Sequence, residues 1–172
     1  MARHFNITGG FIQELLAAGD NTNVSSISLT NVDSTGTATN AIVDLYIEKR
    51  SLGKFYLLQN VSIPYGVSLM YDIKSFNNST GEFGLYIQLT KGTTFTLTGS
   101  IDPAASTSVT GSGTKFLTEV SVGDEIVVTG ETRIVESISS NTLLTVTTAF
   151  SNNSNDTSPD CNPVAPVDVI LY

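Results

Sequence analysis

The clearest structural signal is the octapeptide Ala41-Ile42-Val43-Asp44-Leu45-Tyr46-Ile47-Glu48, in which apolar and polar side chains alternate. Val43, Leu45 and Ile47 point to one face of an extended chain, and the residues between them point to the other face. The stretch Phe83–Leu89 alternates in the same way. A period of two predicts half-buried β-strands rather than amphipathic helices.

Further strands are expected on both sides of this octapeptide. They are Val24–Thr30, with Ile27 and Leu29 on one face, and then Lys54–Leu58, Val61–Ile63 and Val67–Tyr71. Turn residues separate them at Asp33–Thr37 and Asn77–Gly81, and Pro64 marks a strand end because it cannot donate to a ladder. Short strands with polar turns at this spacing predict an all-β fold, an antiparallel β-sandwich of the jelly-roll or immunoglobulin-like kind.

The second half of the chain has a different character. Through Lys91 there are seven acidic and six basic residues, but from Gly92 onward there are nine acidic and two basic residues. Its strands are short and punctuated by glycines, which predicts a small β-barrel-like domain of five strands. The final apolar strand, Pro166–Tyr172, has no obvious place in such a barrel. We therefore expect a β-sandwich of residues 21–96 plus 162–172 with residues 97–161 inserted; two consecutive domains are the alternative.

Residues 1–20 are expected to form an N-terminal arm or a short helix. Phe11–Ala18 is the only stretch of helix-forming composition, and at about two turns it needs something to pack on. We expect this arm to contact a neighbouring protein through His4, Phe5, Phe11, Ile12, Leu15 and Leu16. Tyr46 and Tyr86 lie on the polar faces of their strands, so they are either exposed for recognition or buried under a second layer.

Composition excludes several classes of function. The net charge is −8 with only eight basic residues, which argues against nucleic-acid binding because phosphate neutralisation supplies most of that affinity. No apolar run approaches the roughly 20 residues of a membrane-spanning helix, and no signal peptide follows Met1, so we expect a protein made in the cytosol without a membrane partner. One Cys and one His exclude a disulfide framework and a multi-histidine metal site.

No catalytic residue, cofactor or metal ligand emerges from the motifs. Gly53-Lys54 lacks the surroundings of a phosphate loop, and the lone His4 cannot be assigned as a general base. Cys161 has no second imidazole to activate it, so an unreactive thiol is expected. The acidic residues near Asp124 and Glu131 are interpreted as a solvated surface.

One group of segments contains a strand that precedes an Ile-Pro-x-Gly-x-x-Leu turn and comprises Val43–Glu48, Phe55–Leu58 and Ile63–Leu69. A second group comprises Val109–Phe116, Val122–Ile126 and Leu143–Val146. The first group resembles virion structural proteins of tailed bacteriophages, particularly cyanophages, and the second is similar to a small β-module of phage tail, neck and head-surface proteins. The resemblance covers residues 24–90 and 109–150. It implies a virion component and carries over no catalytic residues.

The expected function is therefore non-enzymatic. The leading hypothesis is a structural component of a phage virion, either a capsid decoration (cement) protein or a neck, connector or tail component. Its partners would be other virion proteins (major capsid, neck or tail proteins) and further copies of itself as a homo-oligomer, because interface cores are depleted in charge and this chain has only 14% charged residues. The alternative is a carbohydrate-binding or host-adhesion module, against which the absence of Trp counts.

Overall fold

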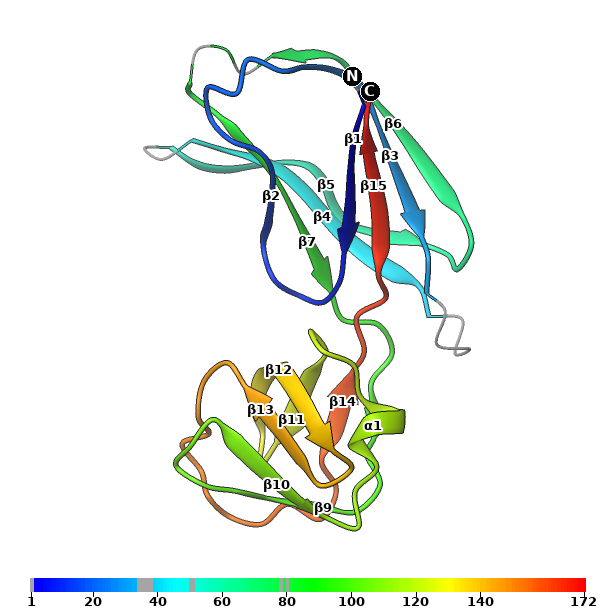
Figure 1. Ribbon diagram of the computed structural model, residues 1–172. Helices are drawn as coiled ribbons and strands as arrows, with labels where there is room; N and C mark the ends of the chain where they lie inside the picture. Colours follow the sequence, from blue (N-terminus) through cyan, green and yellow to red (C-terminus); the bar gives the residue numbers. More distant parts are fainter. Residues whose placement is uncertain (1, 34–38, 50–51, 78, 80) are drawn as a thin grey trace. The chain divides into compact units, whose positions relative to one another are not determined.

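The computed structural model describes residues 2–33, 39–49, 52–77, 79 and 81–172 (Figure 1). The turns expected at Asp33–Thr37 and Asn77–Gly81 lie partly outside the described residues. The chain divides into two compact units. Unit 1 comprises residues 1–90 and 165–172, and unit 2 comprises residues 91–164.

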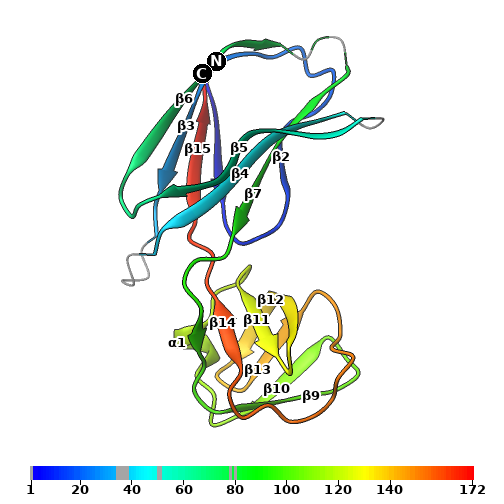
Figure 2. The same ribbon diagram turned by 180° about the vertical axis from the view of Figure 1, so that it is seen from behind.

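Unit 1 is a sandwich of two four-stranded antiparallel sheets, drawn as two layers in Figures 1 and 2. One sheet has the order β1-β15-β3-β6 and the other has the order β2-β7-β4-β5. Counted along unit 1, β15 is the eighth strand, so the orders are 1-8-3-6 and 2-7-4-5. This is the jelly-roll arrangement of eight strands, not the immunoglobulin one. The strands are β1 (Arg3–Ile7), β2 (Gln13–Leu16), β3 (Asn23–Asn31), β4 (Ala41–Lys49), β5 (Gly53–Ile63), β6 (Ser68–Asn77), β7 (Gly84–Thr90) and β15 (Val167–Leu171).

The core of unit 1 lies between the inner faces of these sheets. The alternation predicted from the sequence is confirmed there, because Val43 and Leu45 of β4 are fully buried and so are Ile27 and Leu29 of β3. Branched side chains in a period of two suit strands that each bury one face. The β5 strand ends at Ile63, and Pro64 follows it as expected for a residue without an N–H.

Residues 1–20, expected as an arm or a short helix, are two strands of the sandwich instead. β1 pairs with β15 and β2 pairs with β7. A register shift between Glu14 and Leu16 accompanies the burial of both Leu15 and Leu16. The short segment thus gains ladder hydrogen bonds and core burial that a two-turn helix would lack. Arg3 also donates to both carboxylate oxygens of Asp20 at 2.6 and 2.7 Å and lowers the Asp20 pKa to about 2.

Unit 2 contains one seven-stranded sheet in the order β8-β14-β11-β12-β13-β10-β9, with a short helix, α1 (Phe116–Glu119). The sequence predicts a barrel-like domain of five strands here, and the observed sheet has seven. β8 and β9 stand at the two ends of the sheet but follow each other in the chain, and Ile101 of β9 bridges to Asp156. The sheet therefore curls almost into a barrel. Its strands are β8 (Phe95–Thr96), β9 (Ser100–Pro103), β10 (Ser108–Ser112), β11 (Glu125–Val128), β12 (Glu131–Ser140), β13 (Leu143–Val146) and β14 (Asp160–Asn162).

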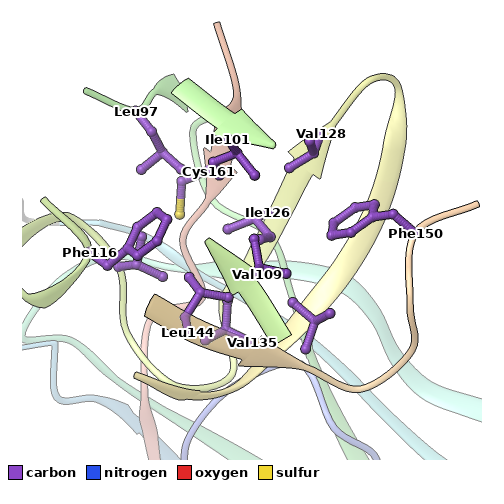
Figure 3. Close-up of a cluster of buried hydrophobic side chains, with 12 residues drawn as sticks. Leu97, Ile101, Val109, Phe116, Ile126, Val128, Val135, Leu144, Phe150 and Cys161 are labelled. Carbon is purple, nitrogen blue, oxygen red and sulfur yellow. The ribbon is translucent and has the colours of Figure 1, made fainter. Parts of the chain in front are cut away.

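Unit 2 has its own apolar core, which Figure 3 shows in close-up. Phe116 of α1, Leu144 of β13 and Cys161 of β14 all point into it and are fully buried. The expected boundaries at 96/97 and 161/162 lie inside unit 2, because β8 pairs with β14. By the structural division, unit 1 has eight acidic and five basic residues and unit 2 has eight acidic and three basic residues. The charge difference between the two modules is thus smaller than the halves of the sequence suggest.

Candidate functional site

A row of tyrosines crosses the outer face of the sheet β2-β7-β4-β5. Tyr46 of β4 stands opposite Tyr56 of β5 on one side and opposite Tyr86 of β7 on the other. The ring centroids of Tyr46 and Tyr56 are 5.5 Å apart, and those of Tyr46 and Tyr86 are 5.7 Å apart with nearly parallel planes. Three aromatic residues at directly paired positions stabilise one another across the strands. We call these residues the tyrosine row.

Two opposite charges flank the tyrosine row. Tyr86 donates a hydrogen bond from Oη to Glu14 Oε2 at 3.3 Å, and Glu14 lies on the edge strand β2. Lys54 lies on the other edge strand, β5, and its ammonium is 4.3 Å from the Tyr46 ring centroid. Desolvation and then the Glu14 charge raise the pKa of Tyr86. The contact with the Tyr46 hydroxyl raises the pKa of Lys54.

Tyr46 is completely buried under these neighbours. Its hydroxyl makes no hydrogen bond of normal geometry within the described part of the chain, although the Lys54 ammonium is near it. Tyr46 therefore offers no ring face to a ligand such as a sugar. The sequence left two alternatives for Tyr46 and Tyr86, exposure for recognition or burial. Tyr46 is buried, whereas Tyr86 is partly exposed.

The predicted interface residues near the N-terminus do not form one surface. Leu15 and Leu16 belong to the core of unit 1, so they cannot contact another protein while the sandwich is folded. His4 of β1 is exposed, and Phe5 is half-buried because it faces the core side of the same strand. Phe11 and Ile12 remain exposed at 40% and 52%.

Several exposed apolar side chains fall within one stretch of the sequence that was not predicted to be an interface. Residues 52–70, spanning β5, the following turn and the start of β6, carry six large apolar side chains that are 44–64% exposed: Leu52, Phe55, Tyr56, Tyr65, Val67 and Met70. β5 and β6 are edge strands, each bonded to one neighbour only. We call this stretch the β5–β6 edge. Strand alternation could not reveal it, since edge position depends on the sheet order.

The acidic residues of unit 2 hold its loops together. Asp124, expected on a solvated surface, is only 4% exposed and accepts hydrogen bonds from the backbone N–H of Ser121 and Val164, both at 2.8 Å. Glu131 accepts from the backbone N–H groups of Ser151 and Asn152 and from the Ser151 hydroxyl. These bonds, led by the one from the Ser151 hydroxyl, lower the Glu131 pKa to about 2.

The remaining reactive groups of unit 2 are also engaged. Burial, followed by the Asp124 charge, raises the pKa of the Cys161 thiol, so the nucleophilic thiolate is disfavoured. An open hollow lies over Glu125, Arg133 and the threonines beside them, but the Arg133 guanidinium donates to Ala149, Thr132 and Glu131. Among the described residues no cluster of His, Cys, Asp and Glu is arranged to hold a metal ion.

No protein-family model, no curated protein and no solved structure matches this chain. In the part of the chain that the structure describes, none of the helical segments has the length and apolar character required to cross a bilayer. The function of the chain is therefore inferred from its own residues and their arrangement.

Proposed function

We propose that the protein is a non-enzymatic structural component of a bacteriophage virion, a capsid decoration protein or a neck, connector or tail component, which binds neighbouring virion proteins. The β5–β6 edge carries this proposal. Its six exposed apolar side chains lie within 19 successive residues along two edge strands. Large exposed apolar side chains are a feature of protein-binding sites, and unpaired strand edges add backbone groups for a partner.

The resemblance to phage proteins falls on the same part of the molecule. The segments Phe55–Leu58 and Ile63–Leu69 belong to β5, the following turn and β6. Jelly rolls occur in viral capsid proteins and also in lectins, so topology alone agrees with either class. The burial of Tyr46 removes the central ring of the tyrosine row as a platform for sugars, and we therefore favour protein partners.

Particles of the phage that encodes the protein test the proposal. Mass spectrometry of particles purified by density gradient is expected to find this chain among the structural proteins. A chain that is abundant in lysates of infected cells but missing from purified particles would refute the proposal.

A double variant, Tyr65→Ser with Met70→Ser, tests the surface that carries the proposal. Both side chains are more than half exposed, so the sandwich is expected to fold normally. The variant is expected to be depleted from particles. Leu117→Ser in unit 2, a position with 59% exposure, is the matched control and is expected to be incorporated at the normal level. Equal incorporation of both variants would contradict an interface at the β5–β6 edge.

A further inference from the structure

Strand β6 has one hydrogen-bonded neighbour and one open side among the described strands. It pairs with β3 at the margin of the sheet β1-β15-β3-β6, and Figures 1 and 2 both show it outermost. Residues 68–72 pair with residues 26–30 of β3 in one uninterrupted antiparallel register. The turn that begins at Pro64 precedes this run, and Lys74, with a φ of 44°, follows it. A regular edge of five residues is thus available for a further strand.

Hydrogen bonds on the two sides of β3 show which residues of β6 face the open side. Asn31 of β3 donates its N–H to the Val67 carbonyl at 3.1 Å, so odd-numbered residues of β3 bond toward β6. Ser26, an even-numbered residue, accepts through its carbonyl from Tyr172 on the other side. Because bonded positions alternate along an antiparallel strand, odd-numbered residues of β6 bond to β3. Three residues of the regular run therefore direct their N–H and C=O groups to the open side: Ser68, Met70 and Asp72.

The open side of β6 lacks the features that usually protect an edge strand. The sequence from Phe55 to Tyr71 contains no charged residue, and β3 contains none either. Met70, in the middle of the regular run, is 62% exposed. The other edges of unit 1 are less open, because β2 and β5 are interrupted by register shifts and β1 carries Arg3. Charges and irregularities of this kind discourage strand addition, so β6 is the edge that suits it best.

A second β6 strand matches this edge. A two-fold axis perpendicular to the sheet at Met70 sets two β6 strands antiparallel, with Met70 of one copy opposite Met70 of the other. Ser68 of each copy then stands opposite Asp72 of its partner. All three open residues of each strand thus meet one another, and two bonds for each pair give about six backbone hydrogen bonds. A shift of two residues in either direction would bring the turn or the irregularity at Lys74 into the ladder and lose bonds.

The charged groups near this seam do not oppose the arrangement. Asp72 and Lys74 are the charged residues of β6, and their signs are opposite. Asp72 faces the Ser68 hydroxyl of the partner subunit, which can donate to a carboxylate. The two Asp72 residues lie four positions apart along the seam, about 13 Å, which exceeds the Debye length of about 8 Å. Asp168, the charged residue of β15, accepts from Asn6 and lies two strands away from β6. The seam therefore brings no like charges together.

We propose that a second copy of this chain adds to the open edge of β6, so that two four-stranded sheets join into one continuous sheet. The proposal rests on the proposed function and deepens it, because it names the chain itself as an occupant of the β5–β6 edge. The uncharged and uninterrupted run 68–72, with its three open backbone positions, is the observation that carries it.

The length of the seam sets the expected strength. Five residues at about 3.3 Å give about 17 Å of paired strand. Interfaces smaller than about 1,200 Å² are usually weak and transient, so this short seam is expected to form at high local concentration, as on the surface of a particle.

Sedimentation velocity of the purified full-length chain tests the dimer. Between about 10 µM and 1 mM it is expected to show a reversible monomer–dimer equilibrium. Met70→Lys sets like charges opposite each other on the axis and is expected to raise the dissociation constant by about 10-fold or more. Leu117→Lys adds the same charge at a 59% exposed position of unit 2 and is expected to leave the constant within about 2-fold. Thermal unfolding checks that both variants are folded. A chain that stays monomeric at 1 mM, or Met70→Lys without effect, would overturn the proposal.

Single cysteines test the register. Met70→Cys places two thiols on the axis with Cα atoms about 5.5 Å apart, so oxidised glutathione is expected to produce a disulfide-linked dimer. Ser68→Cys places them about 13 Å apart along the seam and is expected to remain monomeric on a non-reducing gel. The native Cys161 is fully buried and does not compete. Equal cross-linking of the two variants, or none for Met70→Cys, would also overturn the proposal. These results are independent of whether the chain is found in purified particles, which is the test of the proposed function.

Discussion

Replacing Tyr46 with Phe is expected to stabilise unit 1. The Tyr46 hydroxyl is buried without a hydrogen bond of normal geometry, and a buried polar group in that condition costs about 1–3 kcal/mol. The substitution removes only this oxygen. The ring keeps its contacts with Tyr56 and Tyr86, and the Lys54 ammonium keeps an aromatic face at 4.3 Å. We therefore expect the free energy of unfolding to rise by about 1–2 kcal/mol, which is the lower part of the range for an unsatisfied buried polar group.

Intrinsic tyrosine fluorescence measures this change in unit 1 alone. All six tyrosines lie in unit 1 and the chain has no Trp, so unit 2 gives no such signal. For a unit of about 100 residues, 1 kcal/mol shifts the melting temperature by about 4–8 °C. Tyr46→Phe is therefore expected to raise the melting temperature of unit 1 by about 5–10 °C and to raise its urea midpoint without changing the slope.

The matched control is Tyr56→Phe, which removes the hydroxyl of a residue with 44% exposure in the same row. It is expected to change the free energy of unfolding by less than about 0.5 kcal/mol. A lower melting temperature for Tyr46→Phe would refute the reasoning, because it would mean that the contact between the Tyr46 hydroxyl and the Lys54 ammonium outweighs the cost of burying the hydroxyl. An independent readout is the Lys54 pKa, which is expected to fall toward its ordinary value once the hydroxyl that raises it is gone. NMR titration of the lysine side chains measures it.

Three further predictions concern single positions. Glu131→Gln is expected to loosen the loop that begins at Ser151, which faster amide exchange in that loop would show. Because the Glu131 pKa is lowered from 4.5 to about 2 in the folded chain, the carboxylate contributes fully to stability above about pH 4.5, and this contribution is lost as the pH falls toward 2. Acid unfolding of the wild type and the variant tests this pH dependence. Gly84→Ala is expected to displace the Tyr86 ring, whose atoms would lie 2.6–2.9 Å from the new Cβ, and to break its hydrogen bond to the edge strand, with changed ring chemical shifts as the measure and unchanged shifts as the contrary result. Phe116→Ala is expected to cost about 3–5 kcal/mol in unit 2, since the ring is fully buried; hydrogen exchange in unit 2 would show it, and unaltered exchange there would contradict the packing described.

The strands of unit 1 could be predicted from the sequence wherever one face is buried and the other polar. Ile27 and Leu29, or Val43 and Leu45, carry that information locally, because side-chain period follows from backbone geometry alone. The segment around Leu15 and Leu16 could not be predicted in this way. Two adjacent leucines favour a helix in local sequence analysis. Both lie in a strand that faces the core because the strand has a register shift beside β7, whose residues are about 70 positions further along the chain.

The candidate site depended on register, which the sequence does not encode locally. Strand alternation alone predicts Tyr46 and Tyr86 on the polar faces of their strands, but it does not connect Tyr56 and Lys54 with them. Their pairing follows from the way β5 returns along β4, and two register shifts in that pair change which residues share a face. Asp124 was missed for a related reason, since its partner Val164 is 40 residues further along the chain.

The position of β15 in its sheet has a consequence for how the chain is made. β15 lies between β1 and β3, and its Asp168 bonds to Asn6, 162 positions earlier. At the usual speed of translation, about 5–20 residues per second, β15 is synthesised about 10–30 s after β1. During that time unit 2 can finish folding, because all of its strands precede β15, while the nascent sandwich keeps a strand-wide gap with unpaired backbone on both sides. Such a gap accepts any suitable extended segment, so a β15 strand supplied in trans is expected to complete a chain that has been released before residue 167.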